Sequence, residues 1–382
     1  MDESLEVDDF STEDVLYDAA DTFLNELAKH HDPALLDRRL ELAGFYRRFH
    51  NRWQRAFDTL EFVVQAHEEA GVLFKSYHDL KFPTDEEKTY EYSALILLHA
   101  RACQVAREVL VLITAGYADG AMARWRALYE MATVAEFIRE HGEETAERFL
   151  KYRVVETYKQ GRKYEEHYEE LGFEPLEDDA LDRLSEQVDK LTDKYGNSYY
   201  SNWGWAEQDL EEDAHRGEVA KQVGTVKFSP FYAMASNSVH GGSKGSQERL
   251  ALRKSVQETL LPLGPQEAGF TDPAQLTSLM LHRVTAALLE LGEDPHWTAV
   301  TEALEQIAHE VPGAFVADPF ETAIKESSEE IAEVIVDRVK QEIKEREDID
   351  GLGDLEVDNL DIDDILEDIF GWESAEENNR ED

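Results

Sequence analysis

Cysteine is almost absent from this sequence: Cys103 is the single one among 382 residues. One cysteine excludes disulfide bonds within the chain and a cysteine-ligated metal site. Because Cys103 lies among apolar residues, we expect it to be an unreactive thiol in the core. Long apolar runs are absent as well, and without about 18 consecutive apolar residues no membrane-spanning helix is predicted. Residues 1–14 contain no apolar stretch typical of a secretory signal, so we expect a cytoplasmic protein without membrane contact.

Positive charge is scarce. The chain carries 84 Asp and Glu against 38 Lys and Arg, a net charge of −46, and only 16 of the basic residues are Lys. Such an acidic, lysine-poor composition is similar to that of proteins from extreme halophiles. In molar salt the Debye length is about 3 Å, so repulsion between the carboxylates is screened. We therefore interpret the acidity first as adaptation to salt, and it does not exclude binding to RNA.

Several catalytic motifs are also missing. The sequence contains no GxxxxGK(S/T) phosphate loop, no HExxH and no paired Glu-x-x-His. These absences leave phosphate-loop, zinc-peptidase and di-iron chemistry without support. We expect neither a metal nor a cofactor.

What the sequence does contain is apolar residues that recur at intervals of three and four, without an alternating β pattern or an internal repeat. This pattern predicts an all-α fold, a bundle of long antiparallel helices with an acidic C-terminal extension. Two signals interrupt the helical pattern in the first third of the chain. They are a break at His30–His31–Asp32–Pro33 and a capping box at Thr84 and Glu87. We predict helices over residues 12–30, 34–77, 85–115, 116–141, 143–172, 176–195, 214–223, 229–240, 247–261, 272–291, 296–310 and 320–347.

Four parts are predicted along the chain: an N-terminal helical arm over residues 1–82, a core helical domain over 83–311, an exposed long helix over 312–347 and an acidic tail over 348–382. We expect residues 1–11 to be disordered, and the tail to be disordered or to fold onto a partner protein. The boundary near residue 312 is placed at Pro312–Pro319.

Two stripes in these flanking parts suggest contacts with other molecules. The arm carries the only dense basic stripe, which consists of Arg38, Arg39, Arg47, Arg48, Arg52 and Arg55. This stripe is either a solvated face paired with nearby acids or a contact surface for RNA or an acidic partner. The helix over 320–347 carries a narrow apolar stripe, on which a homodimer is one hypothesis: Ile324, Ile331, Val334, Ile335, Val339 and Ile343.

The predicted helix from Gly116 to His141 is where we first look for function. It is apolar on nearly every side, which is typical of a buried helix. Yet Arg126 and Glu130 lie four residues apart on one of its faces. A charge pair inside a core costs several kcal/mol unless both partners are hydrogen-bonded. The pair is therefore a candidate for function.

A second polar pair, Ser236 and His240, lies four residues apart on a later predicted helix. This helix ends in glycines directly after His240. We propose His240, Arg126 and Glu130 as candidate catalytic residues, with His240 accessible for acid–base chemistry. The candidate binding residues are Tyr129, Tyr152, Trp203 and Ser236. Trp203 belongs to an aromatic loop over residues 195–210, which either covers the core or forms a binding platform.

Two functions remain open for these residues. In the first, they form a structural network or bind a small anionic ligand, in a non-catalytic binding or interaction protein. In the second, they form a metal-independent ribonuclease of a defence or stress system. There His240 would transfer the proton and Arg126 would stabilise the charge that develops on the phosphate.

Three segments carry a resemblance to a known family: GYADGAMARWRALYE, YSNWGWA and FYAMASNSVHGG. In this order they resemble the motifs of the family catalogued as domain of unknown function 5677, over about Tyr90 to Leu291. The resemblance implies an all-α domain of bacteria and archaea without an established activity. A weaker analogy is to the HEPN class of helical domains, many of which are ribonucleases. Their site has an Arg separated from the His by four to six residues, and no Arg lies at that spacing before His240.

Overall fold

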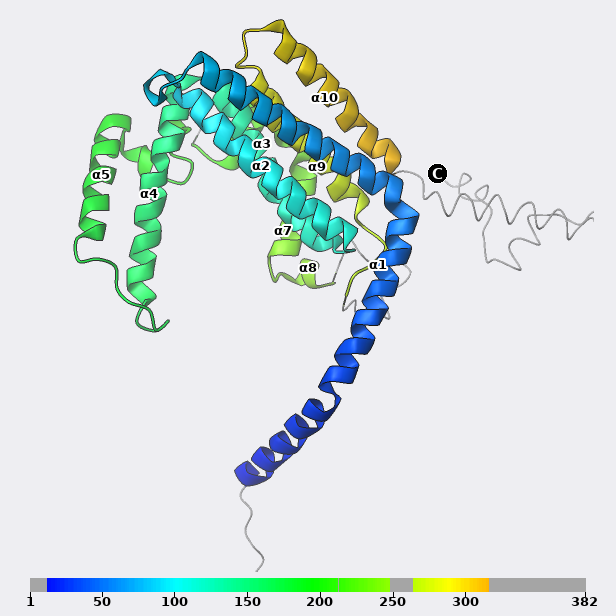
Figure 1. Ribbon diagram of the computed structural model, residues 1–382. Coiled ribbons are helices and arrows are strands. Elements are labelled where there is room, and N and C mark those ends of the chain that lie inside the picture. The colour runs from blue at the N-terminus through cyan, green and yellow to red at the C-terminus, as the bar shows by residue number, and fades with distance from the viewer. Residues whose placement is uncertain (1–11, 212, 248–263, 316–382) are drawn as a thin grey trace, which may run out of the picture.

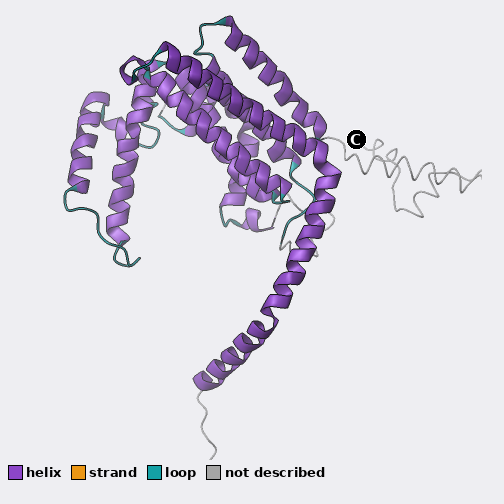
Figure 2. Ribbon diagram, viewed as in Figure 1, coloured by secondary structure: helices purple, strands orange, loops and turns teal. Residues whose placement is uncertain are grey.

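The protein is described by a computed structural model over residues 12–211, 213–247 and 264–315. These residues form ten α-helices and four short 3-10 helices and contain no strand, which confirms the all-α prediction (Figures 1 and 2). The α-helices are α1 Thr12–Lys81, α2 Tyr90–Thr114, α3 Ala118–His141, α4 Glu143–His167, α5 Ala180–Tyr195, α6 Arg216–Gln222, α7 Ser229–Val239, α8 Ser243–Gln247, α9 Thr271–Leu289 and α10 Pro295–Ala314. The 3-10 helices are Asp85–Glu87, Asn197–Tyr200, Glu207–Asp209 and Thr225–Phe228.

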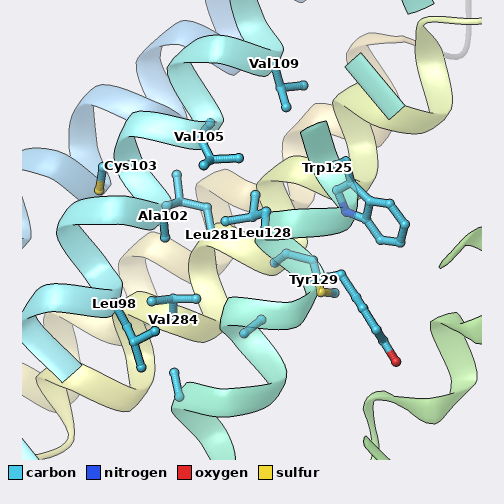
Figure 3. Close-up of a cluster of buried hydrophobic side chains, with 14 of the residues drawn as sticks. Leu98, Ala102, Cys103, Val105, Val109, Trp125, Leu128, Tyr129, Leu281 and Val284 are labelled. Atoms are coloured by element: carbon cyan, nitrogen blue, oxygen red, sulfur yellow. The ribbon is translucent and has the colours of Figure 1, made fainter. Parts of the chain in front are cut away.

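The core lies between α2, α3 and α9, with the second half of α1 and α10 packed on one side of them (Figure 1). Figure 3 shows Ala102 of α2, Leu128 of α3 and Leu281 of α9 meeting at its centre. The predicted helix over 116–141 is α3, and twelve of its side chains are buried, as its apolar sequence predicts. The polar side chains of α3 therefore lie close to the helices that pack around it.

Helix α1 has two different halves. From Phe49 to Phe74 its apolar face is buried against the body, whereas residues 20–40 are exposed and the helix projects away from the body (Figure 1). The second half of the predicted arm over 1–82 therefore shares the core with the later helices. The division into four parts stays a prediction.

The predicted break at Pro33 is wrong, because α1 continues through this residue. A proline inside a helix lacks the N–H that would bond the carbonyl four residues earlier, here that of Lys29. The helix around Pro33 is fully exposed, so water can bond this carbonyl. A helix in that environment absorbs a proline by bending, and α1 is curved where it projects (Figure 1).

The helix predicted to end at Glu310 instead continues through Pro312 to Ala314. Here the carbonyl that loses its helical N–H belongs to Ala308, which is buried. The Ser278 hydroxyl of α9 lies 3.2 Å from this carbonyl oxygen and 2.8 Å from that of Gln275, and its hydrogen is shared between them. A donor from another helix thus replaces the missing N–H, which local sequence cannot reveal.

Thr84 and Glu87, the predicted capping box, form only its half in which the glutamate side chain accepts from the Thr84 N–H, and they do not begin the long helix predicted from Asp85. The Thr84 N–H and hydroxyl donate to Glu87 Oε2 at 3.0 and 2.9 Å, around the 3-10 turn Asp85–Glu87. Helix α2 begins at Tyr90, where the Thr89 hydroxyl accepts from the Tyr92 N–H at 3.1 Å. Predictions for residues 1–11, 248–261, 320–347 and 348–382 lie outside the described residues.

One glycine of α1 is required by close packing. A methyl group added at Gly71 would lie 2.1 Å from Cε1 of the buried His99 ring. We expect Gly71→Ala to lower the free energy of unfolding by about 1–3 kcal/mol because the ring must move, although alanine favours a helix by about 1 kcal/mol over glycine. Gly44→Ala in the same helix is the control, since its nearest neighbour is the flexible end of Arg48 at 3.2 Å. Urea unfolding that finds both variants equally stable would contradict this reasoning.

Candidate ligand-binding site

Five side chains from three helices meet at one edge of α3, and we call them the Arg–Tyr cluster: Arg126, Tyr129 and Glu130 of α3, Arg216 of α6 and Tyr232 of α7. Helix α3 presents its three members on one side because they lie three and four residues apart. Helices α6 and α7 both pack on this side of α3.

Tyr232 is the centre of the Arg–Tyr cluster. Its hydroxyl donates to Glu130 Oε1 at 2.6 Å. The guanidinium carbons of Arg216 and Arg126 lie 3.8 and 4.6 Å from its ring centroid, within the range of cation–π attraction. Burial raises the pKa of the Tyr232 hydroxyl, and the hydrogen bond to Glu130 raises it further. Tyr232 is therefore a neutral donor at neutral pH and an aromatic platform for two cations.

The Arg126–Glu130 pair predicted from the sequence is present, but it is half-buried and not enclosed in the core. Arg126 Nε lies 3.4 Å from Glu130 Oε1, and the two side chains are 25% and 38% exposed. This Nε is itself buried and has no hydrogen bond. Other parts of both side chains are open to solvent, so water and ligands can reach the pair.

Arg216 carries the uncompensated charge of the Arg–Tyr cluster. It forms no ion pair with any carboxylate of the described residues, and its contacts are the rings of Tyr232 and Tyr129. Other arginines of the body are paired: Arg124 with Glu108, Arg139 with Glu91 and Glu290, Arg148 with Asp209 and Arg283 with Glu136. The cluster therefore holds two cations and one carboxylate.

Tyr129, predicted as a binding residue, is fully buried and supports the Arg–Tyr cluster from below. Its side chain extends away from α2 (Figure 3), and its hydroxyl donates to the Thr225 carbonyl at 3.3 Å. The Thr133 and Thr225 hydroxyls lie 2.9 Å apart in the same interior. These bonds hold the segment between α6 and α7 against α3, and so they position Arg216 and Tyr232.

The structure does not bring His240 into the Arg–Tyr cluster. His240 is exposed and directly follows α7, eight residues after Tyr232, which is about 12 Å along a helix axis. Ser236 is half-buried, and its hydroxyl donates to the carbonyl of Tyr232 at 2.9 Å, within its own helix. Of the predicted set, Arg126 and Glu130 of α3 therefore meet α7 at Tyr232, whereas Ser236 lies one turn further along α7 and His240 follows its end.

Tyr152 and Trp203 lie elsewhere, where the aromatic loop packs on α4. The Tyr152 hydroxyl donates to the Ser201 carbonyl, and Trp203 has a φ of 64° with its ring 5.8 Å from that of Trp205. Tyr199 and Trp205 are buried, so the loop covers the core there. This arrangement favours the core interpretation of the loop over a binding platform.

Arg148 holds this loop in place, and we call its contacts the Arg148 clamp. The side chain is 3% exposed and donates to the Trp205 carbonyl at 2.9 Å, Gln208 Oε1 at 3.2 Å, Thr145 Oγ1 at 3.0 Å and the Asp209 carboxylate. The backbone carbonyl of Arg148 accepts from the Tyr199 hydroxyl at 2.6 Å. A buried guanidinium satisfied on all sides is a structural anchor.

Sequence reasoning did not identify Arg148, Arg216 or Tyr232. Tyr232 carried a signal, because it lies four residues before Ser236 and therefore on the same face of α7. Nothing in the sequence around Arg216 distinguishes it from a solvated arginine. What distinguishes Arg216 is its contact with the ring of Tyr232, sixteen positions later, which the fold brings close to it.

The described residues thus form an all-α protein with a half-buried cationic and aromatic cluster. Residues 92–257 match the model of the Family of unknown function (DUF5677), which confirms the family resemblance for this part of the chain. The match covers α2 to α7 and so includes the Arg–Tyr cluster. The matched range is shorter than the Tyr90–Leu291 span of the resemblance. Comparisons with curated proteins and with solved structures gave no match.

No group of three or more His, Cys, Asp or Glu within the described ranges is arranged to hold a metal ion. Among the helices that the structure describes, none is long and apolar enough to cross a membrane.

Proposed function

We propose that this protein is a non-catalytic binding protein whose Arg–Tyr cluster takes up an anionic group such as a phosphate or carboxylate. The observation that carries the proposal is the pair of guanidinium groups over Tyr232, of which Arg126 pairs with Glu130. In a chain of net charge −46, a half-buried arginine that has no ion pair among the described residues is an unusual concentration of positive charge.

The chemistry of the cluster suits a planar or tetrahedral oxyanion. A guanidinium stacked on an aromatic ring leaves its N–H groups free at the ring edge, where they can donate two parallel bonds to an anion. Arg216 is held in this way by Tyr232 and Tyr129. Glu130 engages the Tyr232 hydroxyl, which orients the ring and favours ligands that do not compete with this bond.

Titration calorimetry with pyrophosphate and with adenosine mono- and triphosphate tests the proposal, at low and at molar KCl. We expect Arg216→Ala to weaken binding about tenfold or more, because a charge-assisted hydrogen bond contributes about 1.5–3 kcal/mol. Arg216→Lys should recover only part of the affinity, since an ammonium cannot donate the paired bonds. Arg153→Ala is the control, because it removes an exposed arginine of α4 that has no ion pair among the described residues. Binding that is equal in all four proteins, or absent in the parent, would overturn the proposal.

The ribonuclease hypothesis remains the alternative, and the same proteins test it. It requires His240 to act together with Arg126, and these residues lie near opposite ends of α7. RNA cleavage that both His240→Ala and Arg126→Ala abolish, with unchanged melting temperatures, would replace the binding proposal by a catalytic one.

A further inference from the structure

The projecting part of α1, residues 20–44, has an apolar surface that the described residues leave exposed, and we call it the α1 arm. Six large apolar side chains are between 40% and 64% exposed there. Exposed apolar groups concentrated on one element indicate a contact surface. They are Phe23, Leu24, Leu27, Leu35, Leu36 and Leu40.

Part of this surface continues the face of α1 that is buried in the body. In a helix, residues separated by three, four, seven or eight positions lie on one side. Such steps lead from the exposed Leu24, Leu27 and Leu35 of the arm through Leu42 to the core residues Phe49 and Trp53 of the same helix. The core-facing side of α1 thus extends beyond the body that covers it.

The last described residue lies at the base of the α1 arm. Phe315 is 2% exposed, and its ring stacks on Trp53 with centroids 6.3 Å apart and packs against Phe57 at 6.1 Å. Another 67 residues follow Phe315, from 316 to 382. The chain therefore continues from the place where α1 leaves the body.

The next stretch of sequence matches the α1 arm in length and in character. Residues 320–347 carry the apolar stripe at helical spacing described above, preceded by Pro319, a residue favoured at helix starts. As a helix, these 28 residues would be about 42 Å long, and the 25 residues of the arm about 38 Å. A helix that leaves Phe315 along the arm would run antiparallel to α1.

Charge favours the same antiparallel arrangement. Residues 320–337 contain six acidic residues and one Lys, a charge of −5, and would lie beside residues 33–50, which contain four Arg and two acidic residues, a charge of +2. Residues 338–347 contain four basic and three acidic residues, a charge of +1, and would lie beside residues 23–32, with two acidic residues and one Lys, a charge of −1. Both halves are therefore complementary, and the opposite direction would place like charges together.

We propose that residues 320–347 of the same chain form a helix that packs antiparallel on the α1 arm and covers its apolar surface. Because the segment is tethered a few residues away at Phe315, its effective concentration exceeds that of a second copy in dilute solution. The arm and this segment form one helical hairpin, and its basic stripe binds acids of its own chain. The proposal does not depend on the Arg–Tyr cluster.

Cross-linking of the full chain tests the proposed neighbours. In the antiparallel arrangement Ile343 lies close to Leu27, so the variant Leu27→Cys/Ile343→Cys should be linked within one chain by a short bismaleimide. Leu27→Cys/Ile324→Cys is the control, because its second cysteine lies about 28 Å further along the helix. Linked peptides in the monomer band of the first variant, and at least tenfold less in the control, are expected. A link found only between two chains would show that a second copy covers the arm, and equal linking in both variants would also overturn the proposal.

Hydrogen exchange tests the charge pairing without new cysteines. In low salt, Glu329→Arg/Glu330→Arg/Glu333→Arg should raise the exchange rates of arm peptides at least tenfold, as should ending the chain after Phe315. Glu373→Arg/Glu376→Arg/Glu377→Arg changes the net charge equally and should leave these rates unchanged. Adding Arg38→Glu/Arg39→Glu/Arg47→Glu to the first variant should restore protection. Arm peptides that exchange equally in all these proteins would contradict the proposal.

Discussion

Arg148→Ala is expected to lower the free energy of unfolding by about 3–5 kcal/mol, the largest effect of any single substitution discussed for this protein. The substitution leaves the Asp209 carboxylate without its cation and the Trp205 carbonyl and the Thr145 hydroxyl without their donor. All three groups lie where the aromatic loop packs on α4. A charge left without its partner in a largely buried place costs far more than the ion pair contributes, and the Asp209 side chain, 17% exposed, can be reached by water only in part.

Unfolding in guanidinium chloride, whose high ionic strength screens the surface charge, measures this effect. Arg153→Ala, on the exposed side of the same helix, is the matched control and should change the free energy of unfolding by less than about 0.5 kcal/mol. Removing both partners in Arg148→Met/Asp209→Leu should cost less than Arg148→Ala alone, since no charge is then left unpaired. Equal stability of Arg148→Ala and Arg153→Ala would show that the Arg148 clamp is not an anchor.

Acidification from pH 7.5 to 4.5 is expected to remove about 5 kcal/mol of stability through two buried histidines. His67 of α1 is fully buried and His99 of α2 is 3% exposed. Burial lowers the pKa of His67 to about 3 and that of His99 to about 4. The Val63 carbonyl accepts from His67 Nδ1 at 2.7 Å and opposes the shift, whereas the charges of His282 and His99 add to it.

The direction follows from the protons bound in each state. Below pH 6.5 the unfolded chain takes up a proton at each histidine, while the folded protein keeps both rings neutral down to about pH 4 for His99 and pH 3 for His67. Stability is therefore complete above pH 6.5 and decreases as the pH falls, by about 1.4 kcal/mol per unit for each ring. Glu68 opposes the shift of His99 and does not reverse it.

Chemical unfolding at pH 7.5, 6.0, 5.0 and 4.5, at constant salt, measures this loss. His67→Gln removes one of the two rings, and its amide can still donate to the Val63 carbonyl, so about half of the loss between pH 6.5 and 4.5 should disappear. His30→Gln, on the exposed arm, is the control and should follow the parent. Carboxylates that titrate below pH 5 are present in all three proteins and cancel in the comparison. A pH dependence of His67→Gln equal to that of the parent would rule out this role for His67.

The buried surroundings of His99 also make the neighbouring Cys103 unreactive. Cys103 is 6% exposed, and burial raises its pKa to about 12. Its sulfur lies 3.5 Å from Nε2 of His99. At neutral pH almost none of it is thiolate, the reactive form, which agrees with the unreactive core thiol expected from the sequence.

Much of the fold was predictable because helix formation and burial are encoded over short distances. The three- and four-residue spacing of apolar residues located α3 and α9 within about two residues and marked α3 as buried on most sides. The Arg126–Glu130 pair was predictable for the same reason, since residues four apart on a helix are neighbours whatever surrounds them. A single cysteine excluded disulfides without any structure.

The spacing of apolar residues could not predict which residues from distant parts of the chain come into contact. Glu130 meets Tyr232 across 102 positions, and Arg148 meets Asp209 across 61, so local sequence does not distinguish these residues from solvated ones. His240 directly follows the helix that carries Tyr232, and the direction of α7 places it away from Arg126.

Prolines show the same division between sequence and structure. Pro33 and Pro312 each remove a helical hydrogen bond, and the sequence predicted a break at both. Solvent around Pro33 and the Ser278 hydroxyl near the Ala308 carbonyl let both helices continue. The sequence by itself determined which segments are helical and which of their faces are apolar, because these depend on neighbours along the chain. Only the tertiary structure decided which charges are paired, which arginine lies on aromatic rings and which apolar face the described residues leave exposed, because these depend on groups brought together from distant positions.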